Sequence, residues 1–120
     1  MTGPRPPFEI TESTADGVLR LSLMGELDRW SARVLEDRLG RLRVLKTPVR
    51  LDLSALEFID SAGVRLLIQS VGDARIKHWQ FQIERGLAPQ VSSLFRLMHL
   101  DRFIDGDATE GVTRGPSLSL

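Results

Sequence analysis

The sequence contains no cysteine. This absence excludes disulfides, thiolate chemistry and zinc sites built with cysteine ligands, and it is compatible with the reducing cytoplasm, where we expect the protein to reside. Long apolar runs are also missing, since none approaches the roughly 20 residues that span a bilayer. The N-terminal stretch MTGPRPPF lacks the apolar segment of a signal peptide. We therefore expect a protein that is not exported and does not bind a membrane directly.

The sequence has no excess of either charge, because 16 lysines and arginines balance 16 aspartates and glutamates. Its densest basic stretch, residues 38–46, alternates with leucines as the surface of a helix does. A nucleic-acid partner is therefore not expected. The chain has 120 residues, of which 42% are hydrophobic and 27% charged, and these values are typical of one folded domain.

Signals for cofactors and for catalysis are also absent. No glycine-rich motif of the phosphate-binding or dinucleotide-binding type is present, and His78 and His99 are too far apart in sequence to face one metal from a single helix. Ser61 follows Asp60, but an activated serine needs a general base, and no histidine or lysine lies nearby in sequence. We expect no cofactor, no metal and no enzymatic activity, and a hydrolase that uses Ser61 is the least favoured hypothesis.

The first part of the chain alternates in hydropathy and then changes to a helical period. Phe8 and Ile10 form one alternating run, and a second run with leucines at 19, 21 and 23 follows after the turn sequence ADG, which predicts an antiparallel hairpin. Residues 29–45 carry apolar side chains at steps of three and four, which predicts a helix with Asp28 as its N-cap.

The second part alternates strands with helices. Residues 49–53 and 79–83 have the period of strands, with SALEF as a short connection after the first of them. Two further helices are predicted by the i, i+3, i+4, i+7 spacing, one with Gly72 near its end and one that begins near Pro89. Their apolar stripes are Val64, Leu67, Ile68 and Val71, and Val91, Leu94, Phe95 and Met98.

This order predicts an α/β fold in which a mixed sheet, made of the N-terminal hairpin and parallel strands, packs with three to four helices. The predicted domain covers residues 8–104. Residues 1–7, which contain three prolines, are predicted to be a flexible leader, and residues 105–120 a disordered tail.

The stretch EFIDSAGVRLLIQS, residues 57–70, places a serine where a helix begins. Either Asp60 or Ser61 could cap this helix, because either side-chain oxygen can accept from the amides of the first turn. A phosphate on Ser61 would lie at the positive end of the helix dipole, so the fold would tolerate it. The outer surface would nevertheless gain negative charge, and phosphorylation there would act as a switch on binding.

These residues resemble the STAS domain family (sulphate transporter and anti-sigma factor antagonist), most closely its free-standing bacterial members. LSLMGELDRWSA is similar to the family's segment that enters the first helix, and APQVSSLFRLMHLDRFI to its last helix. The most specific part is LDLSALEFIDSAG, which resembles the strand, loop and phosphorylation motif of the family. The resemblance covers nearly the whole predicted domain.

The resemblance implies an anti-sigma factor antagonist. In that role the unphosphorylated protein binds an anti-sigma factor that is also a serine kinase, and thereby releases a sigma factor. Phosphorylation of Ser61 ends this binding, and a metal-dependent serine phosphatase restores it. The expected partner-binding surface is formed by Asp28, Arg29, Trp30, Ser31, Phe58, Asp60, Ser61, Ala62, Gly63, Val64 and Arg65.

The resemblance leaves some alternatives open. STAS domains also serve as non-enzymatic accessory subunits of transporter ATPases and in stress-signalling assemblies. Trp30 is either an exposed anchor for a partner or a side chain packed at the start of the helix. Departures from the family are Ala62 in place of a second serine, the bulky stretch RIKHWQ in place of glycines, and Ala88 in place of a serine cap.

Overall fold

The computed structural model describes residues 8–100. The predicted leader, the predicted tail and residues 101–104 of the predicted domain lie outside this range. The described elements, in chain order, are β1 (Glu9–Ala15), β2 (Val18–Leu27), α1 (Arg29–Val44), β3 (Val49–Ile59), α2 (Ser61–Lys77), β4 (Phe81–Ile83) and α3 (Pro89–Leu97).

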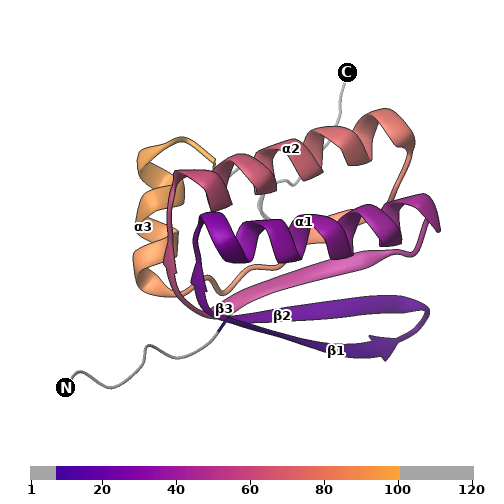
Figure 1. The fold of residues 1–120 in the computed structure, drawn as a ribbon, viewed down its shortest axis with the longest axis horizontal. Helices are drawn as coiled ribbons and strands as arrows, with labels where there is room; N and C mark the ends of the chain where they lie inside the picture. Colours follow the sequence, from indigo (N-terminus) through magenta and orange to yellow (C-terminus); the bar gives the residue numbers. More distant parts are fainter. Residues whose placement is uncertain (1–7, 101–120) are drawn as a thin grey trace.

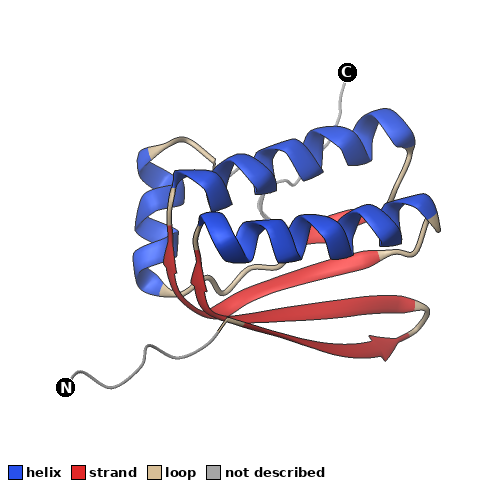
Figure 2. Ribbon diagram, viewed as in Figure 1, coloured by secondary structure: helices blue, strands red, loops and turns tan. Residues whose placement is uncertain are grey.

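The strands form one mixed sheet in the order β1-β2-β3-β4 (Figure 2). β1 and β2 are antiparallel, whereas β2 pairs with β3 and β3 with β4 in parallel. Asp16 and Gly17 form the two-residue hairpin turn with positive φ angles of 55° and 78°, the conformation that suits the twist of a hairpin. The predicted hairpin, the mixed sheet and the α/β fold class are confirmed.

Helices α1 and α2 lie side by side over one face of the sheet (Figure 1). Both begin at the same end of the molecule, where α3 lies across the ends of the strands (Figure 1). This arrangement is expected from the two crossovers that connect parallel strands, because such connections are right-handed as a rule and each crossover helix must return over the sheet. The first turns of α1 and α2, and the residues that precede them, are therefore brought together.

The predicted short connection SALEF is wrong, because β3 continues to Ile59 and includes these residues. After Leu53 the buried residues of β3 are Leu56 and Ile59, three positions apart instead of two. The pairing with β2 shifts at two places: Ser22 pairs with Asp52 but Met24 with Ala55, and Gly25 pairs with Leu56 but Glu26 with Phe58. Each shift inserts an extra residue into β3, and this breaks the alternation that identifies a strand.

The end of α2 also differs from the prediction. Gly72 lies within the helix, which continues to Lys77 and ends at His78 in the left-handed conformation with φ 56°. Trp79, only 4% exposed, fixes this turn: its backbone amide donates to the Ala74 carbonyl at 2.9 Å, and its indole Nε1 donates to the Thr47 carbonyl at 2.6 Å. Buried Trp79 thus holds the turn formed by the bulky stretch RIKHWQ.

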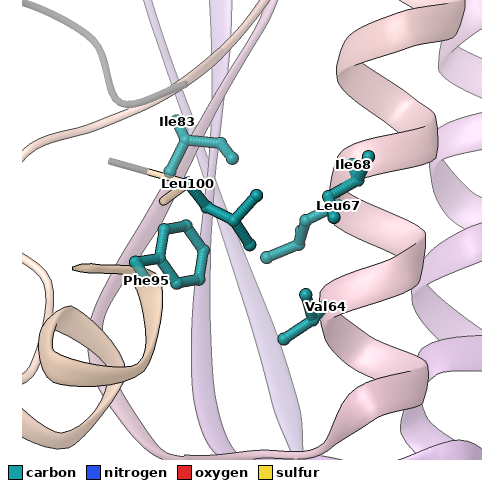
Figure 3. Close-up of a pocket in the computed structure, with 6 residues that line it drawn as sticks. All are labelled: Val64, Leu67, Ile68, Ile83, Phe95 and Leu100. Carbon is teal, nitrogen blue, oxygen red and sulfur yellow. The ribbon is translucent and has the colours of Figure 1, made fainter. Parts of the chain in front are cut away.

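The core lies between the sheet and the helices. The predicted helix with Pro89 in its first turn is confirmed, and Ala88 provides no side-chain cap for it. Phe95 of α3 and Ile83 of β4 point toward Val64 and Leu67 of α2 and line a small apolar pocket with them (Figure 3). Ile68, predicted as part of the inward stripe, lies at the rim of this pocket and is 40% exposed.

The sheet face away from α1 and α2 carries a charged cluster. Arg20 donates to both carboxylate oxygens of Glu84, at 2.8 and 2.9 Å, and its Nη2 lies 3.2 Å from Asp52 Oδ2. Burial raises the pKa of Asp52, but hydrogen bonds from Ser54 and Ser22 and the charge of Arg20 outweigh it and leave the pKa lowered. The hydrogen bond from Arg20 is the main cause of the lowered pKa of Glu84.

The charged cluster predicts a stability that decreases in acid. A carboxylate with a lowered pKa in the folded state stabilises the fold above its unfolded pKa, about 4, and this contribution is lost as the pH falls through the folded value. We expect the free energy of unfolding, measured with urea between pH 5 and pH 2 in steps of about 0.5, to fall more steeply for wild type than for Arg20→Gln. Equal slopes for the two proteins would contradict this role of Arg20.

Candidate functional site

The site forms where β2 and β3 end. Their last paired residues are Glu26 with Phe58 and Leu27 with Ile59, so Asp28 and Asp60 follow the two strands at the same edge of the sheet. The Asp60 amide donates to the Leu27 carbonyl at 3.1 Å, which joins the two chain segments at this point. Side chains near residues 28 and 60, far apart in sequence, therefore share one surface.

Asp28 caps α1, as predicted. Its Oδ1 accepts hydrogen bonds from the backbone amides of Trp30 and Ser31, both at 3.0 Å. The Ser31 hydroxyl accepts in return from the Asp28 amide at 2.8 Å, which completes a capping box. The same hydroxyl donates to the Glu26 carbonyl at 2.6 Å. These bonds fix the direction in which α1 leaves the sheet.

Asp60 caps α2, and this decides between the two residues that the sequence offered. Its Oδ1 accepts from the amides of Ala62 and Gly63 at 2.9 and 3.0 Å. Ser61 is the first residue of the helix, and it is exposed. Within residues 8–100 its hydroxyl makes no hydrogen bond. The capping role and the exposed hydroxyl thus belong to two neighbouring residues.

Gly63 allows the first turn of α2 to approach the strands closely. A Cβ atom added to Gly63 would lie 2.8 Å from Ile59 Cγ1 and 2.8 Å from the Leu27 carbonyl oxygen. A Cβ atom essentially never lies so close to another heavy atom, and the oxygen belongs to a paired strand. The position of Ser61 therefore depends on a glycine two residues later.

The predicted partner-binding residues separate into a surface layer and a supporting layer. Trp30 is 74% exposed and Phe58 47% exposed, so Trp30 is not packed at the start of its helix. The other exposed or half-buried members are Asp28, Arg29, Asp60, Ser61, Ala62 and Arg65. Ser31, Gly63 and Val64 are buried, and they support this surface from beneath instead of forming it.

A groove lies between α1 and α2, and Ala62, the residue after Ser61, is the first residue of α2 in its lining. It is lined by Arg29, Ala32, Arg33 and Glu36 of α1 and by Ala62, Arg65, Leu66 and Gln69 of α2. Arg33 was not predicted as a site residue. The spacing of Arg29 and Arg33 places them on one face of a helix, but the sequence does not show that this face lies opposite α2.

The titratable residues show no metal centre in the part of the chain that the structure describes, since no group of three histidine, aspartate or glutamate side chains there could hold an ion. His78 lies at the end of α2 opposite to Ser61. Among the described residues, no helix has both the length and the apolar character needed to cross a membrane.

Comparison with known proteins identifies relatives of this fold and of this sequence. The family model described as "Mlab, STAS domain" matches residues 10–105. The anti-sigma-F factor antagonist RsfB of Mycobacterium tuberculosis is 43% identical over 65 residues, which are 51% of this chain and 52% of the relative. The chain thus spans about half the length of the curated relatives that it matches.

Solved structures of similar fold also include anti-sigma factor antagonists. One from Mycobacterium paratuberculosis has a TM-score of 0.70 and 28% identity, and the match covers 82% of this chain and 84% of the other. The phosphorylated Bacillus cell fate determinant SpoIIAA has a TM-score of 0.62 and 14% identity, with 91% and 92% covered, and shows the shared fold alone. The family match extends over most of the chain, and this chain therefore belongs to the STAS domain family.

Proposed function

We propose that this chain is a cytoplasmic anti-sigma factor antagonist whose binding is switched at Ser61. In the unphosphorylated state it binds an anti-sigma factor that is also a serine kinase, and the sigma factor is released. The observation that carries this proposal is the exposed Ser61 hydroxyl at the first position of α2, with the cap supplied by Asp60. The names of the relatives, which are anti-sigma factor antagonists, support it.

The modification fits the local geometry. The partner kinase would transfer the γ-phosphoryl group of ATP to Ser61 Oγ, with ADP leaving and the hydroxyl proton released. Because Asp60 carries the hydrogen bonds to the amides of Ala62 and Gly63, the modified hydroxyl is not needed to hold the helix. The fold can therefore keep its structure in both states, and a metal-dependent serine phosphatase can hydrolyse the phosphoserine to restore the first state.

The surface around Ser61 has the composition of a protein-binding site. Trp30 and Phe58 expose large apolar areas close to the charged residues Asp28, Asp60 and Arg65. Aromatic side chains are frequent among the residues that contribute most to binding, and charged residues around them provide specificity. A phosphate in the middle of this surface would add a charge of about −1.5 to −2 where the partner must exclude water.

The experiment that tests the function is an affinity capture from lysate of the source organism, with wild-type, Ser61→Asp and Ser13→Asp proteins as parallel baits. Ser13 of β1 pairs with Arg20 of β2. Arg20 precedes Leu27, which lies at the site, by seven residues, a distance of about 23 Å along the strand. The proposal predicts that wild type and Ser13→Asp retain a small serine kinase of the anti-sigma type and that Ser61→Asp does not. Equal capture of a transporter ATPase by all three baits would contradict it and assign the chain to the accessory subunits.

A further inference from the structure

The groove between α1 and α2 has a marked excess of positive charge. Arg29 and Arg33 line it from α1 and Arg65 lines it from α2, whereas Glu36 is the single acidic residue that the described lining contains. The groove begins at the first turns of both helices, whose amides already bind the carboxylates of Asp28 and Asp60, so its excess of positive charge comes from the arginines. The local electrostatic potential therefore favours an anion.

The three arginines of the groove are unpaired within residues 8–100, as Arg85 and Arg96 also are, whereas several other arginines form ion pairs. Arg38 binds Glu12 with an Nη2 to Oε2 distance of 2.7 Å, and Arg43 lies 3.1 Å from Asp73. In contrast, Arg29, Arg33 and Arg65 make no ion pair and no side-chain hydrogen bond with any residue in the range 8–100. Their guanidinium groups are available for an anion that the unmodified chain does not contain.

Arg65 is the arginine best placed to reach a group on Ser61. It follows Ser61 by four residues in α2, so the two side chains lie on the same face of the helix. Side chains in a helix lean toward its N-terminus, and Arg65 therefore extends over the turn that contains Ser61. Ala62, between them, also lines the groove and has too small a side chain to block the approach.

We propose that the groove holds the phosphate of phosphorylated Ser61, with Arg65 as the main partner and Arg29 and Arg33 as further cations across the groove. This inference rests on the proposed phosphorylation of Ser61. Guanidinium groups bind phosphate oxygens through paired, charge-assisted hydrogen bonds, and they offset the repulsion between the phosphate and the carboxylate of Asp60. Phosphorylation then changes the surface twice, because it adds an anion and also draws Arg65 and Arg29 away from a partner.

The test uses the full chain with phosphoserine encoded at position 61 and follows the phosphate by phosphorus NMR between pH 4 and pH 8. The second pKa of phosphoserine is ordinarily about 6. Cations nearby favour the dianion, so the wild-type background should show a lower value, and Arg65→Gln should raise it by roughly half a unit. Arg41→Gln is the matched control, since Arg41 lies on α1 twelve residues after Arg29, about 18 Å away, and should leave the value unchanged.

One outcome would overturn the inference, namely a phosphate pKa that is the same in wild type and in Arg65→Gln. If unphosphorylated Arg65→Gln also loses the partner, that result assigns the groove to an acidic segment of the partner. The titration needs no kinase and no partner, so a failure of the proposed function, seen as equal capture by the baits above, remains distinguishable from a failure of this inference.

Discussion

Ser61→Asp should fold like wild type and bind its partner on the order of 100-fold more weakly, because a like charge or an unpaired charge in a contact surface costs several kcal/mol. The aspartate side chain adds its charge at the first position of α2, where the helix dipole and the amides of the first turn tolerate an acidic residue. The effect on the free energy of unfolding should therefore stay within about 0.5 kcal/mol. The affinity is measured by calorimetry with the captured partner, and stability by urea unfolding.

Two further variants control the Ser61→Asp experiment. Ser61→Ala removes the acceptor hydroxyl without adding charge and should bind as wild type does, because Asp60 supplies the cap. Ser13→Asp adds the same charge at the distant end of the hairpin and should also bind normally. Unchanged affinity of Ser61→Asp, or a loss shared equally by Ser13→Asp, would contradict a switch located at Ser61.

Gly63→Ala should lower the free energy of unfolding by about 1 to 3 kcal/mol and weaken partner binding at the same time. The added methyl group would lie 2.8 Å from the Leu27 carbonyl oxygen and 2.8 Å from Ile59 Cγ1. The oxygen belongs to β2 where the strand pairs with β3, so α2 has to move instead. Its first turn, with Asp60 and Ser61, would be displaced from the surface that a partner recognises.

The matched control for Gly63→Ala is Gly72→Ala in the same helix. A Cβ atom at Gly72 would meet nothing within 4 Å, so the substitution should stabilise the protein by about 0.5 to 1 kcal/mol through the higher helix propensity of alanine. Thermal or urea unfolding of both variants distinguishes a steric effect from a general effect of glycine replacement. Gly63→Ala with wild-type stability would show that α2 does not depend on this close approach.

Regular periodicity made most of the fold predictable from the sequence. The hairpin, the helix after Asp28 and the helix that starts near Pro89 follow patterns of two or of three and four residues, and the structure confirms them. β3 was predicted too short because its two register shifts place Leu56 and Ile59 three residues apart on the buried side. Such shifts depend on the pairing with β2, which no local pattern in β3 reveals.

The candidate site was predictable only in the parts that depend on local sequence. Asp28 is predictable as a cap because it directly precedes a run of residues with helical spacing. The structure shows the hydrogen bonds of this cap. The sequence does not show whether Asp60 or Ser61 caps α2, because the choice depends on side-chain geometry. The groove of Arg29, Arg33 and Arg65 requires two helices to lie side by side, and this is a property of the tertiary fold.

In the proposed mechanism, phosphorylation of Ser61 controls binding to an anti-sigma factor kinase. The most direct test measures, by titration calorimetry, the affinity of that partner for the full chain with serine and with encoded phosphoserine at position 61. We expect the serine form to bind and the phosphoserine form to bind at least about 100-fold more weakly, since phosphate carries more charge than aspartate. Equal affinity of the two forms would contradict it.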